Sequence, residues 1–120
     1  MRHKYFLALA RKESKRSDHH SHKMGCCLVK GNKVLGVGHN MIKTHPKSPH
    51  QWKCIHAEFM AFLNSNGNID GATAYVFREQ KNGSWAVSRP CKDCWRFLME
   101  KGVKNVVYSF EGNFVQEKVA

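Results

Sequence analysis

Residues 54–58 read Cys-Ile-His-Ala-Glu, and residues 90–94 read Pro-Cys-Lys-Asp-Cys. His56, Cys91 and Cys94 offer one imidazole and two thiolates, which are ligand types that zinc prefers. Three protein ligands leave the fourth tetrahedral position open, as in catalytic rather than structural zinc sites. Water in that position has its pKa lowered towards neutrality. The two segments therefore predict a catalytic zinc site.

Glu58 follows His56 by two residues and adds a carboxylate that need not bind the metal. H-x-E followed by P-C-x-x-C is the signature of zinc nucleobase deaminases, whose glutamate is the general acid and base. Residues two apart on a regular helix do not share a face, so Glu58 and His56 converge only if the helix entry is irregular. The alternative is a closed structural zinc site with a fourth protein ligand. The candidates for that ligand are Cys54, His39, His45 and His50.

Both cysteines fall in the first turn of a helix that Pro90 is expected to open. Cys91 and Cys94 are three residues apart and share a face there. The partial positive charge of a helix N-terminus favours thiolate over thiol. His56 is expected to begin a second helix, which brings two helix entries to one site.

The periodicity of apolar residues predicts alternating helices and strands. Helices are expected over 2–14, 56–66 and from Pro90 to Gly102, and strands over 26–29, 34–37, 73–77, 105–108 and briefly 85–87. The inward residues are expected to be Tyr5, Phe6, Leu9 and Ala10 in the first helix, Phe59, Phe62 and Leu63 in the second, and Trp95, Leu98 and Met99 in the third. This order predicts an α/β fold, a single-domain three-layer αβα sandwich with a mixed central sheet, spanning residues 1–120.

The charge composition indicates what kind of partner the protein binds. The formal net charge is +11, from 20 Lys and Arg against 9 Asp and Glu, which favours an anionic partner such as a free nucleotide or a polynucleotide. A solvated basic face is the alternative. No apolar stretch approaches the ~18 residues of a membrane helix. The basic, apolar start lacks a clear cleavage site, so an amphipathic helix is expected rather than a signal peptide.

Five cysteines, an odd number, fit a reducing compartment, so a cytoplasmic protein is expected. Cys26 and Cys27 stand in an apolar run and are expected to be small buried hydrophobes.

The two zinc segments, together with Gly36-Val37-Gly38-His39-Asn40, resemble the cytidine/deoxycytidylate deaminase superfamily over residues 24–110. The resemblance implies a cytidine deaminase-like fold, a bound Zn²⁺ and a homo-oligomer. It implies these roles: His56, Cys91 and Cys94 as metal ligands, Glu58 as the catalytic acid and base, and Asn40 and Ala57 as substrate contacts.

The implied activity is zinc-dependent hydrolytic deamination, most simply of cytosine to uracil in a free nucleotide or nucleoside, with deoxycytidylate as the leading candidate. One alternative is an enzyme that edits cytosine or adenine in RNA or single-stranded DNA. Another is a non-catalytic zinc module that binds nucleic acid, which would not need Glu58. Met60 and Arg89 each depart from one branch of the superfamily, so the motifs leave the substrate open.

Several other residues are weaker candidates for functional roles. His19, His20 and His22 form either a metal site or an exposed polar loop. His45, His50 and Cys54 are candidates for a second, structural zinc. Trp52, Trp85 and Trp95 are candidates for base stacking or for the core. Arg89, at the mouth of the expected site, is a candidate phosphate contact.

Overall fold

The computed structural model describes residues 2–18, 22–42 and 56–119 of the chain. Its helices are α1 (His3–Ser14), α2 (Ala57–Leu63) and α3 (Lys92–Glu100). Its strands are β1 (Met24–Lys30), β2 (Lys33–His39), β3 (Thr73–Arg78), β4 (Asn105–Phe110) and β5 (Asn113–Lys118). In this part of the chain no helix is both long and apolar enough to cross a bilayer.

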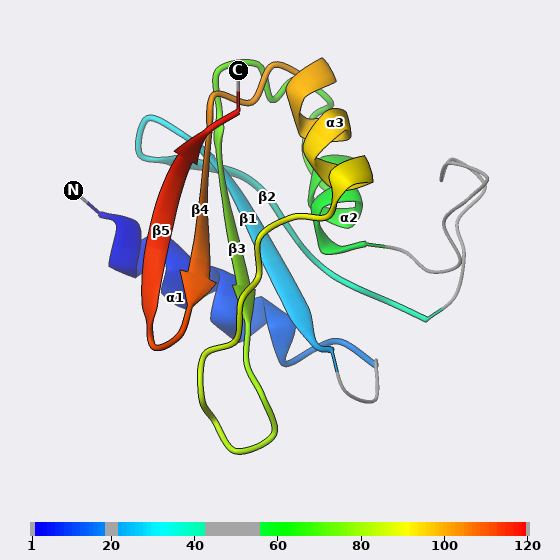
Figure 1. Cartoon of the computed structure of the whole chain (residues 1–120). Coiled ribbons are helices and arrows are strands. Elements are labelled where there is room, and N and C mark those ends of the chain that lie inside the picture. Colours follow the sequence, from blue (N-terminus) through cyan, green and yellow to red (C-terminus); the bar gives the residue numbers. More distant parts are fainter. Residues whose placement is uncertain (1, 19–21, 43–55, 120) are drawn as a thin grey trace.

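The strands form one mixed sheet in the order β2-β1-β3-β4-β5. β3 and β4 are parallel and are linked through α3, whereas the other neighbouring pairs are antiparallel. Figure 1 shows α1 on one face of the sheet and α2 and α3 together on the other. The predicted α/β sandwich with helices on both faces is confirmed.

Each face of the sheet has its own core. On the α1 face, Phe6, Leu7 and Ala10 pack against the strands. On the other face, Ala57, Ala61 and Leu98 lie over strand residues that include Cys26, Leu28, Val76 and Val106. Cys26 and Cys27 are fully buried free thiols on opposite faces, as expected of small buried hydrophobes.

Two expectations about inward residues were wrong. Tyr5 is 52% exposed, because the stripe of α1 that meets the sheet passes through Phe6, Leu7 and Ala10 instead. Met99 is 46% exposed, because α3 turns Leu98 to the sheet and Met99 away from it.

Two glycines of β2 let α2 approach the sheet closely. Gly36 and Gly38 alternate along the strand and so present the same face. A Cβ atom at Gly36 would lie 2.5 Å from the carbonyl oxygen of Ala61. One at Gly38 would overlap the backbone nitrogen of Ala61 and lie 2.8 Å from the oxygen of Ala57. The small residues therefore fix how near the start of α2 comes to β2.

β5 was not predicted. It pairs with β4 through a tight turn at Glu111 and Gly112, where both residues have positive φ, 44° and 83°. The expected short strand over 85–87 is reduced to a single antiparallel bridge between Glu79 and Trp85.

Candidate functional site

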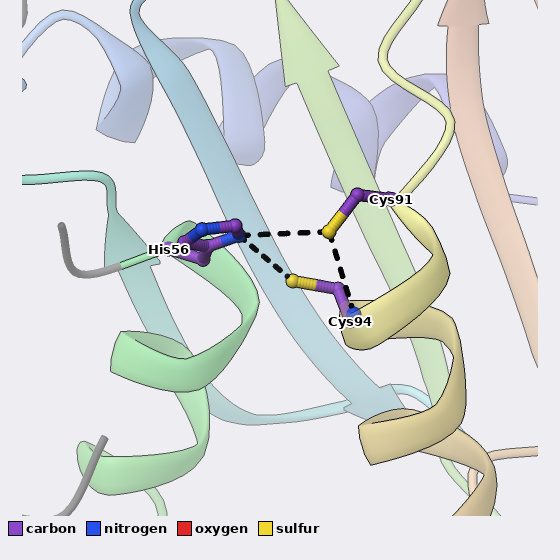
Figure 2. Close-up of side chains that lie close together, drawn as sticks. All are labelled: His56, Cys91 and Cys94. Atoms are coloured by element: carbon purple, nitrogen blue, oxygen red, sulfur yellow. Dashed lines mark hydrogen bonds between the residues drawn. The ribbon is translucent and has the colours of Figure 1, made fainter. Parts of the chain in front are cut away.

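His56, Cys91 and Cys94 come together on the α2 and α3 side of the sheet. The Nδ1 atom of His56 lies 3.1 Å from the Sγ of Cys94 and 3.8 Å from the Sγ of Cys91 (Figure 2). The three ligand atoms all lie within 4.8 Å of one another. Among the described residues, no further His, Cys, Asp or Glu joins this group.

The entries of two helices hold the three side chains. His56 is the N-cap of α2 and has extended backbone angles, φ −81° and ψ 151°. Cys91 is the N-cap of α3, and its sulfur accepts a hydrogen bond from the backbone N–H of Cys94 at 3.4 Å. Because His56 stands before the first helical residue, it is free of the helical spacing that would turn it away from Glu58. This is the irregular entry that the sequence required.

The donor set fits a zinc ion. Zn–N and Zn–S bonds of about 2.0 and 2.3 Å at tetrahedral angles separate neighbouring ligand atoms by about 3.5–3.8 Å. Both measured distances join nitrogen to sulfur, for which these bond lengths give about 3.5 Å. The values of 3.1 and 3.8 Å lie on either side of that separation, so small side-chain shifts suffice. One imidazole and two sulfurs are also the ligand types that zinc prefers.

The three groups perturb one another's proton affinities. Hydrogen bonds from the Cys94 thiol and from His56 lower the pKa of Cys91 to about 3. The hydrogen bond to Cys91, together with burial, raises the pKa of Cys94. The hydrogen bond with Cys91 raises the pKa of His56. Without metal, these shifts favour the thiolate at Cys91 and the thiol at Cys94.

Glu58 is a buried carboxyl group beside these ligands, with 2% of the residue exposed. Burial raises its pKa, and the neighbouring His56 partly opposes that rise. Glu58 is not a member of the ligand group, although it lines the same cavity as His56 and Cys91. A carboxyl group placed in this way can exchange protons with a molecule in the cavity.

The cavity has a volume of about 200 Å³. It is lined by His22, Met24, Asn40, His56, Ala57, Glu58 and Cys91. Five of these seven are predicted site residues. Met24 was missed, and His22 was considered only together with His19 and His20, as a metal site or an exposed polar loop. The hairpin register could have found Met24, because β1 starts beside the end of β2, where Asn40 follows.

Asn40 ties the start of β1 to the end of β2. Its Oδ1 accepts a hydrogen bond from the backbone N–H of Met24 at 2.9 Å, and its Nδ2 donates to the carbonyl of His22 at 2.5 Å. Its own N–H donates to the carbonyl of Met24 at 3.2 Å. The amide that the resemblance assigns to substrate thus also holds the cavity wall in place.

Other candidates lie elsewhere. His39 pairs with Glu13 rather than joining the metal ligands. Trp85 packs edge-on against Phe77 on the α1 face. Trp95 is partly buried against the core. His19, His20, His45, His50, Trp52 and Cys54 lie outside the described residues, so their predicted roles stay predictions.

Arg89 does not line the cavity. Its Nε donates to the carboxylate of Glu117 at 2.7 Å, and its guanidinium lies 4.2 Å from the centre of the Trp95 ring.

Comparisons with known proteins agree with this geometry. The family model described as "Cytidine and deoxycytidylate deaminase zinc-binding region" matches residues 1–110. The deoxycytidylate deaminase of Mycobacterium phage D29 is 30% identical, with 89% of this chain and 93% of that protein covered. The Homo sapiens deoxycytidylate deaminase is 26% identical, with 87% of this chain covered. The chain spans 62% of the length of that human relative.

Solved structures share the fold. The dCMP deaminase of cyanophage S-TIM5, in complex with dCMP and dUMP, gives a TM-score of 0.63 at 23% identity, with 88% of this chain and 78% of that chain covered. A cytidine deaminase from Burkholderia pseudomallei gives 0.73 at 21% identity, with 99% and 94% covered. With the family match over residues 1–110 and the His-Cys-Cys group in place, the chain belongs to the cytidine and deoxycytidylate deaminase zinc-binding family.

Proposed function

We propose that this protein is a zinc-dependent hydrolase that deaminates cytosine to uracil in a free nucleotide or nucleoside, with deoxycytidylate as the leading candidate. The family match supports nucleobase deamination. The choice of deoxycytidylate draws on the phage D29 relative, named deoxycytidylate deaminase, which the chain matches over 93% of its length.

The observation that carries the proposal is the place of Glu58. Its buried carboxyl group shares one cavity with His56 and Cys91, yet it stands outside the ligand group. A structural zinc site needs no such carboxylate, whereas a hydrolytic one needs a group that moves protons. Burial raises the pKa of Glu58, which strengthens it as a base.

Hydrolytic deamination adds water to C4 of cytosine and releases ammonia, leaving a carbonyl group. Zinc held by His56, Cys91 and Cys94 would supply a water molecule of lowered pKa as the nucleophile. Glu58 takes a proton from the attacking water and delivers it to the ring nitrogen N3. It then takes the second proton, from the hydroxyl group now on C4, and passes it to the departing amine, so the C4–N bond breaks as the carbonyl forms. Such proton transfers typically contribute about 10²–10⁴-fold to the rate.

Asn40 and Ala57 are the proposed substrate contacts. Both line the cavity, and Ala57 is the first residue of α2, where backbone N–H groups have no helical partner. Asn40 already makes two side-chain hydrogen bonds, and its amide has four positions in all, so two remain for a sugar hydroxyl. Substitution of Asn40 would therefore affect both substrate binding and the cavity wall.

A polynucleotide substrate is the competing proposal, favoured by the charge. Exposed cations on and just after α1 include Lys4, Lys12, Lys15 and Arg16, whereas the acidic residue of that helix, Glu13, is buried.

A panel of reactions with the zinc-loaded protein separates the two proposed substrate classes. Cytosine and adenine nucleosides, nucleotides and oligonucleotides are incubated with the protein, and ammonia release is measured. Product from free cytosine nucleotides or nucleosides alone is expected, with deoxycytidylate the best of them, and product from oligonucleotides alone would contradict the proposal.

Glu58→Gln tests the catalytic role. The turnover number is expected to fall by about 10²–10⁴-fold, while bound zinc stays at the wild-type level. Glu100→Gln, at an exposed glutamate of α3, serves as the control and should keep full activity. Unchanged turnover in Glu58→Gln would show that the protein is not a deaminase of this kind.

A further inference from the structure

Two buried serine hydroxyls connect the segment before Cys91 to the sheet. The Oγ atoms of Ser88 and Ser109 lie 2.7 Å apart, and the two residues are 1% and 0% exposed. The hydroxyl of Ser88 lies 2.8 Å from the carbonyl oxygen of Val76 in β3, and that of Ser109 lies 2.7 Å from the carbonyl oxygen of Ala86. The pair therefore joins three chain segments at one point.

Backbone groups complete the network. The N–H of Ser109 donates to the Oγ of Ser88 at 2.8 Å, and the N–H of Arg78 donates to the Oγ of Ser109 at 3.1 Å. The N–H of Ser88 donates to the carbonyl of Ser109 at 3.0 Å. Removal of either hydroxyl would leave buried donors and acceptors without these partners, and the chain would have to move to satisfy them.

Little freedom separates Ser88 from the metal ligand Cys91. Only Arg89 and Pro90 stand between them. Proline fixes its own φ and restricts the residue before it to extended angles. Arg89 is also held from the side by the carboxylate of Glu117 at 2.7 Å. A shift of Ser88 is therefore transmitted to Cys91 rather than absorbed.

Cys91 is the ligand that depends most on this connection. Cys94 lies inside the first turn of α3 and is fully buried, whereas Cys91 is the exposed N-cap at the junction of loop and helix. Its position is set by what precedes it as much as by the helix that follows.

We propose that Ser88 and Ser109 form a positioning pair for the metal centre, and that the pair determines where the sulfur of Cys91 stands relative to His56 and Cys94. The inference rests on the proposed metal site but not on deamination. It assigns an effect on metal affinity and on ligand geometry to two residues outside the metal-binding motifs.

The test uses the full chain and two metals. Zn²⁺ affinity is measured by competition with a chromophoric chelator, and Co²⁺ substitution reports ligand geometry through its thiolate absorption bands. Ser88→Ala and Ser109→Ala are each expected to weaken Zn²⁺ binding by about 10-fold, the lower end for supporting groups around a metal site, and to shift the Co²⁺ bands. The double variant should lose little more Zn²⁺ affinity than either single variant, because the two hydroxyls act as a unit.

Two controls isolate the effect. Ser84→Ala removes a hydroxyl from the same connection, but that hydroxyl bonds only to Gln80 and Asn82 within the turn. Val103→Ala opens a cavity in the core just after the C-terminal end of α3, so it controls for the effect of a general loss of stability. Both should keep the wild-type Zn²⁺ affinity and Co²⁺ spectrum. If Ser88→Ala does not fold, Ser109→Ala provides the test, because it breaks the same contact from the strand side.

The outcomes are distinct. Weaker Zn²⁺ binding with shifted Co²⁺ bands in the serine variants alone would support the inference. Wild-type affinity and spectra in both serine variants, or losses equal to that of Val103→Ala, would overturn it. Failure of the wild-type chain itself to bind either metal would instead overturn the proposed metal site.

Discussion

The carboxylate of Glu13 and the Nδ1 atom of His39 lie 2.7 Å apart, joining the last turn of α1 to the end of β2. Their side chains are only 10% and 17% exposed. His39 directly precedes Asn40, which lines the cavity. The contact therefore links the helix on one face of the sheet to a wall of the site on the other.

Glu13→Ala should lower the free energy of unfolding by about 1–3 kcal/mol, because it leaves a mostly buried ring nitrogen without its partner. Urea unfolding followed by tryptophan fluorescence measures the change. Glu100→Ala, at an exposed position, should stay within about 0.5 kcal/mol of the wild type. Equal midpoints for the two variants would contradict a stabilising role for the Glu13–His39 contact.

Gly38→Ala should destabilise the protein by about 1–3 kcal/mol or more, because the added methyl group would overlap the backbone of α2 at Ala61. The helix would have to move away, taking His56 and Glu58 with it, so zinc content should fall as well. Thermal unfolding and metal analysis report the two effects. Val34→Ala, at an exposed position of the same strand, should change neither.

Cys94→Ala should abolish stoichiometric zinc binding, since only one sulfur and one imidazole would remain in the group. Cys27→Ala is the matched control, because Cys27 is also a buried free thiol but lies on the α1 face of the sheet. Metal analysis after dialysis should find about one zinc per chain in that control. Zinc retained by Cys94→Ala would show that the ligand set is wrong.

In the metal-free protein, Cys91 should react with iodoacetamide in acidic solution. Hydrogen bonds from Cys94 and His56 lower the pKa of Cys91 to about 3, so the thiolate is already formed above that pH. Its alkylation rate should be nearly flat from about pH 5 to 8, whereas the rate of an ordinary thiol rises about tenfold per pH unit below its pKa. Mass spectrometry of the labelled peptides identifies the site. Preferential labelling of Cys94 would contradict the assignment, because its pKa is raised.

The sequence predicted the site better than its surroundings. His56, Cys91 and Cys94 follow from ligand chemistry and from two helix starts, and local patterns encode both. The placement of Glu58 beside these ligands also depends on the extended backbone at His56, which hydrophobic periodicity does not predict. A cytoplasmic location and a homo-oligomer stay predictions.

What the sequence did not predict depends on contacts between distant segments. β5 is an edge strand with polar residues on much of its length, so its hydrophobic period is weak, although the Glu111-Gly112 turn was a usable signal. Met99 and Tyr5 stand at the margins of apolar stripes, where the docking angle of the helix decides their burial. The contacts between Ser88 and Ser109 and between Glu13 and His39 span 21 and 26 residues and leave no local pattern.

The two sulfurs of the centre differ in their access to solvent, with Cys91 exposed and Cys94 buried. A zinc ion entering from solvent would therefore reach the exposed Cys91 before the buried Cys94, and a departing ion would leave by the same route. That route passes through the cavity in which Glu58 lies. Zinc and substrate would therefore share one opening. A nucleotide bound in the cavity should slow the removal of zinc by a chelator.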